Sequence, residues 1–263
     1  MVDYMINYLL SFFQNPSAWG IGLAIGFGVI WLACYRPPLF TKPLLWAVLA
    51  GSAFLTMAAV CFVQIPLQTW AGQALGHFWS QEVLIRWILL AAIPQIFLSG
   101  LVQEGAKLVP VVVYWQRSDR NIDPKLGLVI GAVAGAGFGI FELQWVHNLI
   151  FASGWTWAAV QTGGFWALAG FWERFFAVAA HIAFSGLAGY GLARGWGWRF
   201  FLIAAALHAL LNYNLALAQA GILTTTAQVE IYVAVVAVAV TAWALWLRWR
   251  KGADTAEFAI SDP

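Results

Sequence analysis

Residues 126–142 read LGLVIGAVAGAGFGIFE, and this stretch decides the fold class. It has no charged residue before Glu142, and four of its glycines stand four residues apart, at positions 127, 131, 135 and 139. That spacing places the four glycines on one face of a helix, where a neighbouring backbone can come close, as it does between paired membrane helices. We therefore predict a membrane-spanning helix that packs tightly against another helix and carries a carboxylate inside the apolar layer.

The composition extends this prediction to the whole chain. Of the 263 residues, 62% are hydrophobic and only 9% are charged, whereas soluble domains carry about 25% charged residues. The net charge is +2, and the basic residues fall in short loops, so the chain shows no sign of a nucleic-acid partner. We expect a protein integral to the plasma (inner) membrane, surrounded by the lipid bilayer.

The hydrophobic segments predict how often the chain crosses that bilayer. A helix needs about 20 apolar residues to span the membrane, and seven segments are long enough. The third is overlong and contains Pro94, which could divide it and add an eighth span. The predicted spans are about 17–35, 44–65, 84–115, 126–150, 172–193, 200–220 and 226–248. The expected fold is therefore all-α, a polytopic transmembrane helix bundle of seven or eight spans.

The basic residues predict the orientation of the bundle. They gather in alternate loops, namely the first, third and fifth, and again after the last span. By the positive-inside rule the N-terminus is outside and the C-terminus is cytoplasmic. Residues 1–250 are expected to form one membrane domain, with its functional core at about 84–220, and residues 251–263 a short polar cytoplasmic tail.

Ionisable and amide side chains recur inside four of the predicted spans. They lie between ~13 Å and ~24 Å from the cytoplasmic ends of their helices at a rise of about 1.5 Å per residue. Ionisable groups at membrane depth turn inward, pair with one another and mark functional sites. The residues of this layer are Glu104, Lys107, Glu142, His181, His208 and Asn212. We expect them to share one site.

Three chemistries could use such a layer. In the first, His181, His208 and Glu142 bind a metal such as Zn²⁺, which suits imidazole and carboxylate ligands, and Glu104 is the general base. In the second, a glutamate and a histidine activate water without a metal, and Asn212 helps to stabilise an oxyanion. In the third, the buried groups form a proton or ion relay of a transporter.

Two basic residues stand in or near the layer, Lys107 within it and Arg174 outside it. Lys107 follows Glu104 by three residues, on the same helix face, so the two are expected to pair. Arg174 stands at the outer end of its predicted span and is expected to extend toward the membrane surface.

Four short motifs occur in order along the polar layer. Residues 103–107 read QEGAK, residues 138–142 read FGIFE, residues 173–181 read ERFFAVAAH, and residues 208–212 read HALLN. They resemble the motifs of the intramembrane proteases of the CAAX-protease and bacteriocin-processing clan, in particular the PrsW and YhfC families. The resemblance covers about residues 100–215.

The resemblance implies an endopeptidase that cleaves membrane-embedded or membrane-adjacent proteins or peptides. Its implied mechanism is attack by glutamate-activated water, assisted by a metal such as Zn²⁺. Glu104 would activate the water, Lys107 would hold Glu104 in place, and Asn212 would support the oxyanion. Glu142, His181 and His208 would bind the metal.

One position departs from the family pattern. Gln103 stands where the paired-glutamate motif has its first glutamate. A protein that lacks this carboxylate either uses Glu104 instead or is a non-catalytic relative. A proton-coupled or ion transporter is the alternative from a different class.

Overall fold

The computed structural model describes residues 2–251, and within these residues the chain forms helices and no strand. In chain order the elements are α1 (Val2–Ser11), α2 (Ala18–Ala33), α3 (Leu44–Ala59), the π-helical turn η1 (Val60–Gln64), α4 (Ile65–Phe78), α5 (Gln81–Arg86), α6 (Ile88–Ala91), α7 (Ile93–Arg117), α8 (Pro124–Ala152), α9 (Trp157–Gly163), the 3-10 turn η2 (Gly164–Leu168), α10 (Ala169–Ala193), α11 (Gly197–Asn212), α12 (Asn214–Gln219) and α13 (Thr226–Trp249). The predicted all-α fold is confirmed. Apart from Lys251, the predicted polar tail lies outside the described residues.

Six stretches of helix are long and apolar enough to cross a membrane. They are Leu44–Phe78, Ile88–Arg117, Pro124–Ala152, Trp157–Ala193, Gly197–Gln219 and Thr226–Trp249. These stretches overlap the second to seventh predicted spans, whereas the first prediction, at about 17–35, contains only the 16 residues of α2. At 1.5 Å per residue α2 is ~24 Å long, shorter than the ~30 Å hydrocarbon core. The predicted count of seven or eight spans is therefore not confirmed.

Prolines lie at or near several helix boundaries in the first 94 residues. Helix α2 starts after Pro16, where the Ser17 side chain accepts a hydrogen bond from Gly20 N, and it ends shortly before Arg36, which has a φ of 50° and precedes Pro37 and Pro38. The overlong third predicted span is divided into α5, α6 and α7, and Pro94 lies in the first turn of α7, where its missing N–H is not needed. Pro66 follows η1 inside the long helix α3–η1–α4. Prolines and π-helical turns are both common sites of bending in a long helix.

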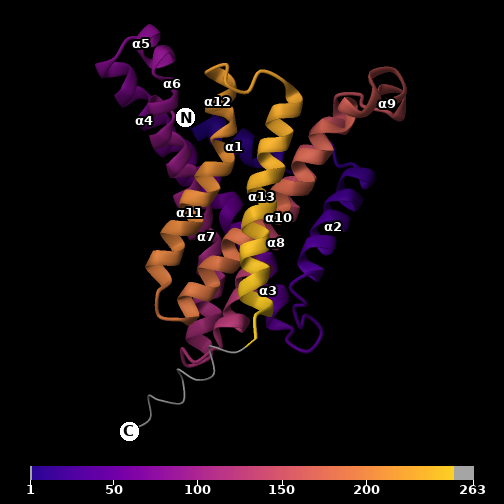
Figure 1. Ribbon diagram of the computed structural model, residues 1–263, viewed down its shortest axis with the longest axis vertical. Coiled ribbons are helices and arrows are strands. Elements are labelled where there is room, and N and C mark those ends of the chain that lie inside the picture. The colour runs from indigo at the N-terminus through magenta and orange to yellow at the C-terminus, as the bar shows by residue number, and fades with distance from the viewer. Residues whose placement is uncertain (1, 252–263) are drawn as a thin grey trace.

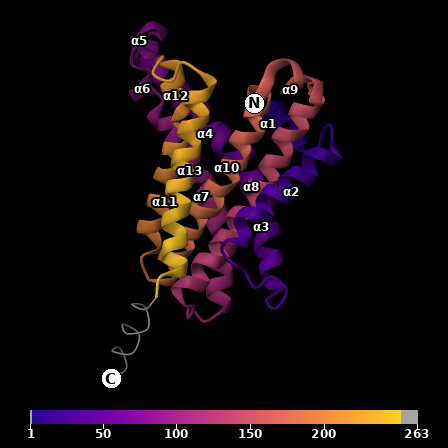
Figure 2. The same ribbon diagram turned by 45° about the vertical axis from the view of Figure 1, so that its right-hand side comes forward.

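Helices α8 and α10 lie in the interior of the bundle and pack along each other (Figure 1). Five helices cover this pair: α2 and α3 pack on α8, α11 and α13 on α10, and α7 on both. Figure 2 shows the same arrangement after a turn of the view, with α5, α9 and α12 at the upper end and the last turn of α13 at the lower end. Between α8 and α10 lie the short elements α9 and η2.

The glycine stripe of α8 makes this central contact possible. A Cβ atom added to Gly131 would lie 2.1 Å from the backbone oxygen of Ser185, and one added to Gly135 would lie 2.2 Å from the backbone oxygen of His181. Such distances are shorter than any van der Waals contact, so the two backbones touch. The predicted tight helix contact is confirmed. Because it runs past His181 and Ser185, it also fixes part of the polar layer.

Candidate functional site

Glu104 lies at the centre of a hydrogen-bonded cluster between α7, α10 and α11. Its side chain is almost fully buried, with the residue 1% exposed. Oε1 accepts a hydrogen bond from Lys107 Nζ at 2.5 Å and lies 2.8 Å from His208 Nδ1. Oε2 accepts from Ser185 Oγ at 3.0 Å. Both carboxylate oxygens are therefore engaged by side chains of the protein.

His181 connects this cluster to Glu142 on α8. Its Nδ1 lies 2.9 Å from Lys107 Nζ, and its Nε2 lies 3.0 Å from Glu142 Oε2. Because an ammonium group can only donate, Nδ1 accepts, and Nε2 carries the proton that is donated to Glu142. The imidazole of His181 faces that of His208, with 5.1 Å between the ring centroids.

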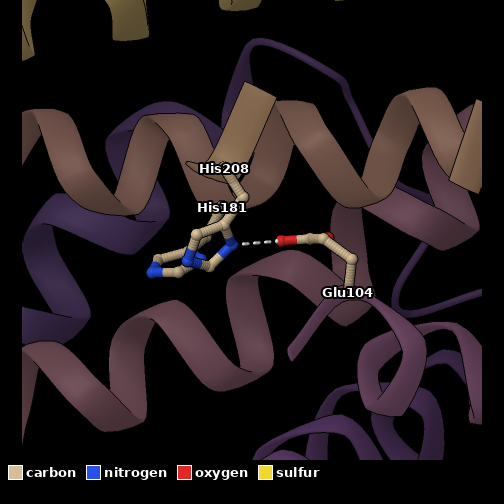
Figure 3. A group of neighbouring side chains, drawn as sticks. All are labelled: Glu104, His181 and His208. Carbon is tan, nitrogen blue, oxygen red and sulfur yellow. Dashed lines mark hydrogen bonds and ion pairs between the residues drawn. The ribbon is translucent and has the colours of Figure 1, made fainter. Parts of the chain in front are cut away.

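Three of these side chains form a potential metal-binding set. One donor atom each from Glu104, His181 and His208 lies within 4.8 Å of the others, and all three residues are buried. Figure 3 shows the two imidazoles side by side, with His208 directed at the Glu104 carboxylate. Two imidazoles and one carboxylate form a donor set that suits Zn²⁺. The residues present therefore fit a transition metal, and Lys107 Nζ contacts two of the same three side chains.

A polar cavity of about 120 Å³ adjoins the cluster. Its lining residues include Gln103, Glu142, Arg174, His181, His208 and Asn212. Glu104 and Lys107, which contact the two histidines, are absent from this lining. The side chain of Glu142 is 22% exposed, whereas that of Glu104 is 0% exposed. The two glutamates thus occupy different environments, one facing the cavity and one sealed in the bundle.

The structure brings the residues of the predicted layer together. Glu142, His181, Lys107, Glu104 and His208 form one continuous chain of hydrogen bonds and ion pairs. Asn212 does not join this chain. It lines the same cavity, and its Nδ2 donates to Ser99 Oγ at 3.2 Å.

Arg174 is the clearest residue that the sequence prediction misplaced. It does not extend toward the membrane surface; it pairs with Glu173, lies 3.7 Å from Glu142 Oε2 through Nη1 and lines the cavity. The reason is the available partner, because a carboxylate within reach holds an arginine that would otherwise seek water. The spacing contained the signal: Arg174 precedes His181 by seven residues, two helical turns on the same face of α10.

A bundle of membrane-length helices with a buried histidine–glutamate cluster beside a polar cavity defines a candidate intramembrane hydrolase. The family model described as PrsW family intramembrane metalloprotease matches residues 41–243. This covers most of the chain, and the protein belongs to the PrsW family. No curated protein and no solved structure matches the chain.

The family match confirms the PrsW part of the predicted resemblance and supports a protease rather than a transporter. It also agrees with the predicted metal-assisted chemistry, because the family is one of metalloproteases. The likeness to YhfC and the wider clan stay predictions, as do the identity of the metal and the role of each residue.

Proposed function

We propose that the protein is an intramembrane endopeptidase that hydrolyses peptide bonds of membrane-embedded or membrane-adjacent substrates at the polar cavity. The observation that carries this proposal is the compact donor set of Glu104, His181 and His208 beside that cavity. These three residues would hold a metal ion such as Zn²⁺, which would act as a Lewis acid when bound. Membership of the PrsW family supports the reaction class.

For the two glutamates, the geometry favours an exchange of the roles predicted from the sequence. A general base must come within hydrogen-bonding distance of the water that it activates. Glu142 faces the cavity and is partly exposed, whereas both oxygens of Glu104 are occupied by Lys107, His208 and Ser185. We assign Glu142 as the base and Glu104 as a metal ligand that also orients His208.

The residues that line the cavity then act in sequence. Glu142 takes a proton from water as the water oxygen bonds to the scissile carbonyl carbon. It gives that proton to the amide nitrogen as the carbon–nitrogen bond breaks. The protonated Nε2 of His181 donates to Glu142 and keeps its carboxylate in position. Asn212 uses one amide hydrogen on Ser99 Oγ, and its second hydrogen is available for the developing oxyanion.

The test combines metal content with cleavage. Purified wild-type protein, Glu104→Gln, His208→Ala and Glu142→Gln would be reconstituted in proteoliposomes with a panel of synthetic single-span peptides. We expect Glu104→Gln and His208→Ala to lose both bound metal and cleavage. Glu142→Gln should keep the metal and lower kcat by about 10²- to 10⁴-fold, the usual contribution of a general base.

Two matched variants control for general effects of substitution. His77→Ala and Glu82→Gln change the same residue types at exposed positions outside the cavity, so both should cleave like wild type. The assignment of base and ligand would be reversed by two results together. Glu142→Gln would cleave like wild type, and Glu104→Gln would lose cleavage while keeping its full metal content. If no variant of the cluster differs from wild type, the protein is not a protease of this design, and proton-coupled uptake becomes the activity to measure.

A further inference from the structure

A ladder of glutamine side chains leads from α4 to the cavity. Gln68 Nε2 donates to the backbone oxygen of Gln95 at 2.7 Å. Gln64 Nε2 donates to Gln68 Oε1 at 3.3 Å, and Gln103 Nε2 donates to Gln64 Oε1 at 3.1 Å. The ladder therefore joins η1 and α4 to α7 and ends at Gln103, on the wall of the cavity.

The hydrogen bond to Gln95 fixes which amide atom each glutamine presents to the next one. The backbone carbonyl of Gln95 can only accept a hydrogen bond, so Gln68 must present its NH₂ group there and its oxygen to Gln64. Gln64 must then offer its NH₂ group to Gln68 and its oxygen to Gln103. By the same logic Gln103 uses its NH₂ group on Gln64. Its Oε1 is left over.

The backbone of η1 supplies the position of Gln64. Gln64 is the last residue of this π-helical turn, and Pro66 stands two residues later, at the start of α4. A π-helical turn shifts the residues that follow it around the helix axis, and such turns frequently occur at functional sites. The turn and the proline together direct Gln64 toward α7.

The leftover oxygen meets no protein partner. Among the described residues, Gln103 Oε1 is a buried atom without a hydrogen bond, although a buried polar atom is normally paired. Two other residues of the cavity lining also carry such atoms, the acceptor Asn214 Oδ1 and the donor Arg174 Nε. The lining of the cavity thus includes two buried acceptors and one buried donor that the described residues leave unpaired.

We propose that Gln103 Oε1 accepts a hydrogen bond from a backbone N–H of the substrate, which crosses the cavity as a locally unwound, extended peptide. The inference rests on the proposed function. In a membrane helix the backbone N–H groups bond within the helix, so an unwound segment needs replacement partners from the enzyme. Gln103 supplies an acceptor, and Asn214 Oδ1 and Arg174 Nε complement neighbouring N–H and C=O groups. As a neutral amide, Gln103 binds the substrate and takes no proton from it.

The test pairs changes in the enzyme with changes in the substrate. A synthetic single-span peptide that the wild-type protein cleaves in proteoliposomes would be remade with one backbone amide at a time replaced by an ester, which removes one N–H. At one position near the scissile bond, the ester should lower kcat/KM of wild type by about 3- to 10-fold, the effect of one neutral hydrogen bond. In Gln103→Leu the same ester should have no effect. Gln103→Glu retains an acceptor oxygen but cannot donate to Gln64, so it should keep a reduced ester effect even where the leucine variant folds poorly.

The ladder is tested through Gln64, which acts by positioning Gln103. Gln64→Leu leaves the amide of Gln103 free to turn, so the ester effect should shrink and KM should rise more than kcat falls. Gln64→Glu keeps an acceptor for Gln103 and should restore the ester effect. Gln73→Leu alters an exposed glutamine of α4 outside the ladder and should behave as wild type.

The possible failures are distinct. Ester effects that are equal in wild type and Gln103→Leu at every position would overturn the role of Gln103 and leave the protease intact. A wild-type protein that cleaves no membrane peptide would overturn the proposed function, and the inference with it.

Discussion

Lys107 places its ammonium group where a metal ion would also be expected to bind. It contacts Glu104 at 2.5 Å and His181 Nδ1 at 2.9 Å, and its side chain has no exposed surface. Without a metal, the ammonium group is the counter-charge nearest to Glu104. Removing one partner of a buried ion pair leaves the other charge uncompensated, which costs about 3–5 kcal/mol.

This pairing predicts a metal-dependent stability. Lys107→Met, in the presence of a chelator, should lower the free energy of unfolding by about 3–5 kcal/mol. Added Zn²⁺ should restore part of that loss, because a metal cation can replace the ammonium beside Glu104. Denaturant unfolding in detergent, followed by tryptophan fluorescence, measures both effects. Lys42→Met, at an exposed lysine, should change neither. A Lys107→Met protein that is as stable as wild type, or one indifferent to Zn²⁺, would refute the prediction.

Much of the site could be predicted at the level of residues. The polar layer, the pairing of Glu104 with Lys107 and the contact of His181 with Glu142 followed from depth and helical spacing. The sequence prediction grouped both histidines with Glu142, whereas the structure groups them with Glu104. Which glutamate faces the cavity could not be predicted. It depends on how α7 and α8 are rotated about their axes, and that rotation is set by packing against other helices and not by depth.

At the scale of elements, the contact between α8 and α10 determines the geometry of the site. Gly135 lies against the backbone of His181, so any separation of these helices moves an imidazole of the cluster. Tightly packed interiors relax only in part around added atoms, and overpacking typically costs about 1–3 kcal/mol.

Two glycine substitutions of opposite expected sign test this contact. Gly135→Ala should destabilise the protein by about 1–3 kcal/mol and abolish cleavage, because its Cβ cannot fit 2.2 Å from the His181 oxygen. Gly26→Ala, in α2, meets nothing within 4 Å. It should be neutral or stabilising by up to about 1 kcal/mol, since alanine favours a helix over glycine. Thermal unfolding and peptide cleavage of both variants provide the comparison, and a harmless Gly135→Ala would contradict the proposed link between packing and site.

Most of the helices were also predictable from hydropathy and glycine spacing. One exception is α2, which is apolar enough to be taken for a full span although it has only 16 residues. The predicted span at about 17–35 includes apolar residues that flank α2, so composition alone overestimates the length of the helix.

At the scale of the whole molecule, α2 determines whether the two ends of the chain lie on opposite sides of the membrane. The loop charges predict an outer N-terminus and a cytoplasmic C-terminus, and this arrangement requires α2 to cross. Cys34 follows the last residue of α2 and is exposed, whereas Cys61 is buried.

These two native cysteines allow the topology to be tested without introducing another cysteine. A membrane-impermeant maleimide should label the wild-type protein in inside-out vesicles and not in right-side-out vesicles. Cys34→Ser should abolish the labelling, because Cys61 is buried in the bundle. Labelling of Cys34 from the outer side would contradict either the crossing of α2 or the predicted orientation.

The pair of Glu104 and Lys107 has a consequence for biogenesis. A single aspartate, lysine or arginine at the centre of a helix raises the free energy of translocon-mediated insertion by about 2.5–3.5 kcal/mol. Here the two opposite charges stand three residues apart on α7, so one helix brings its own counter-ion. The nascent α7 can therefore enter the lipid as a neutralised segment before α10 and α11 have been synthesised. We expect His181 and His208 to join this pair only after α10 and α11 have been inserted.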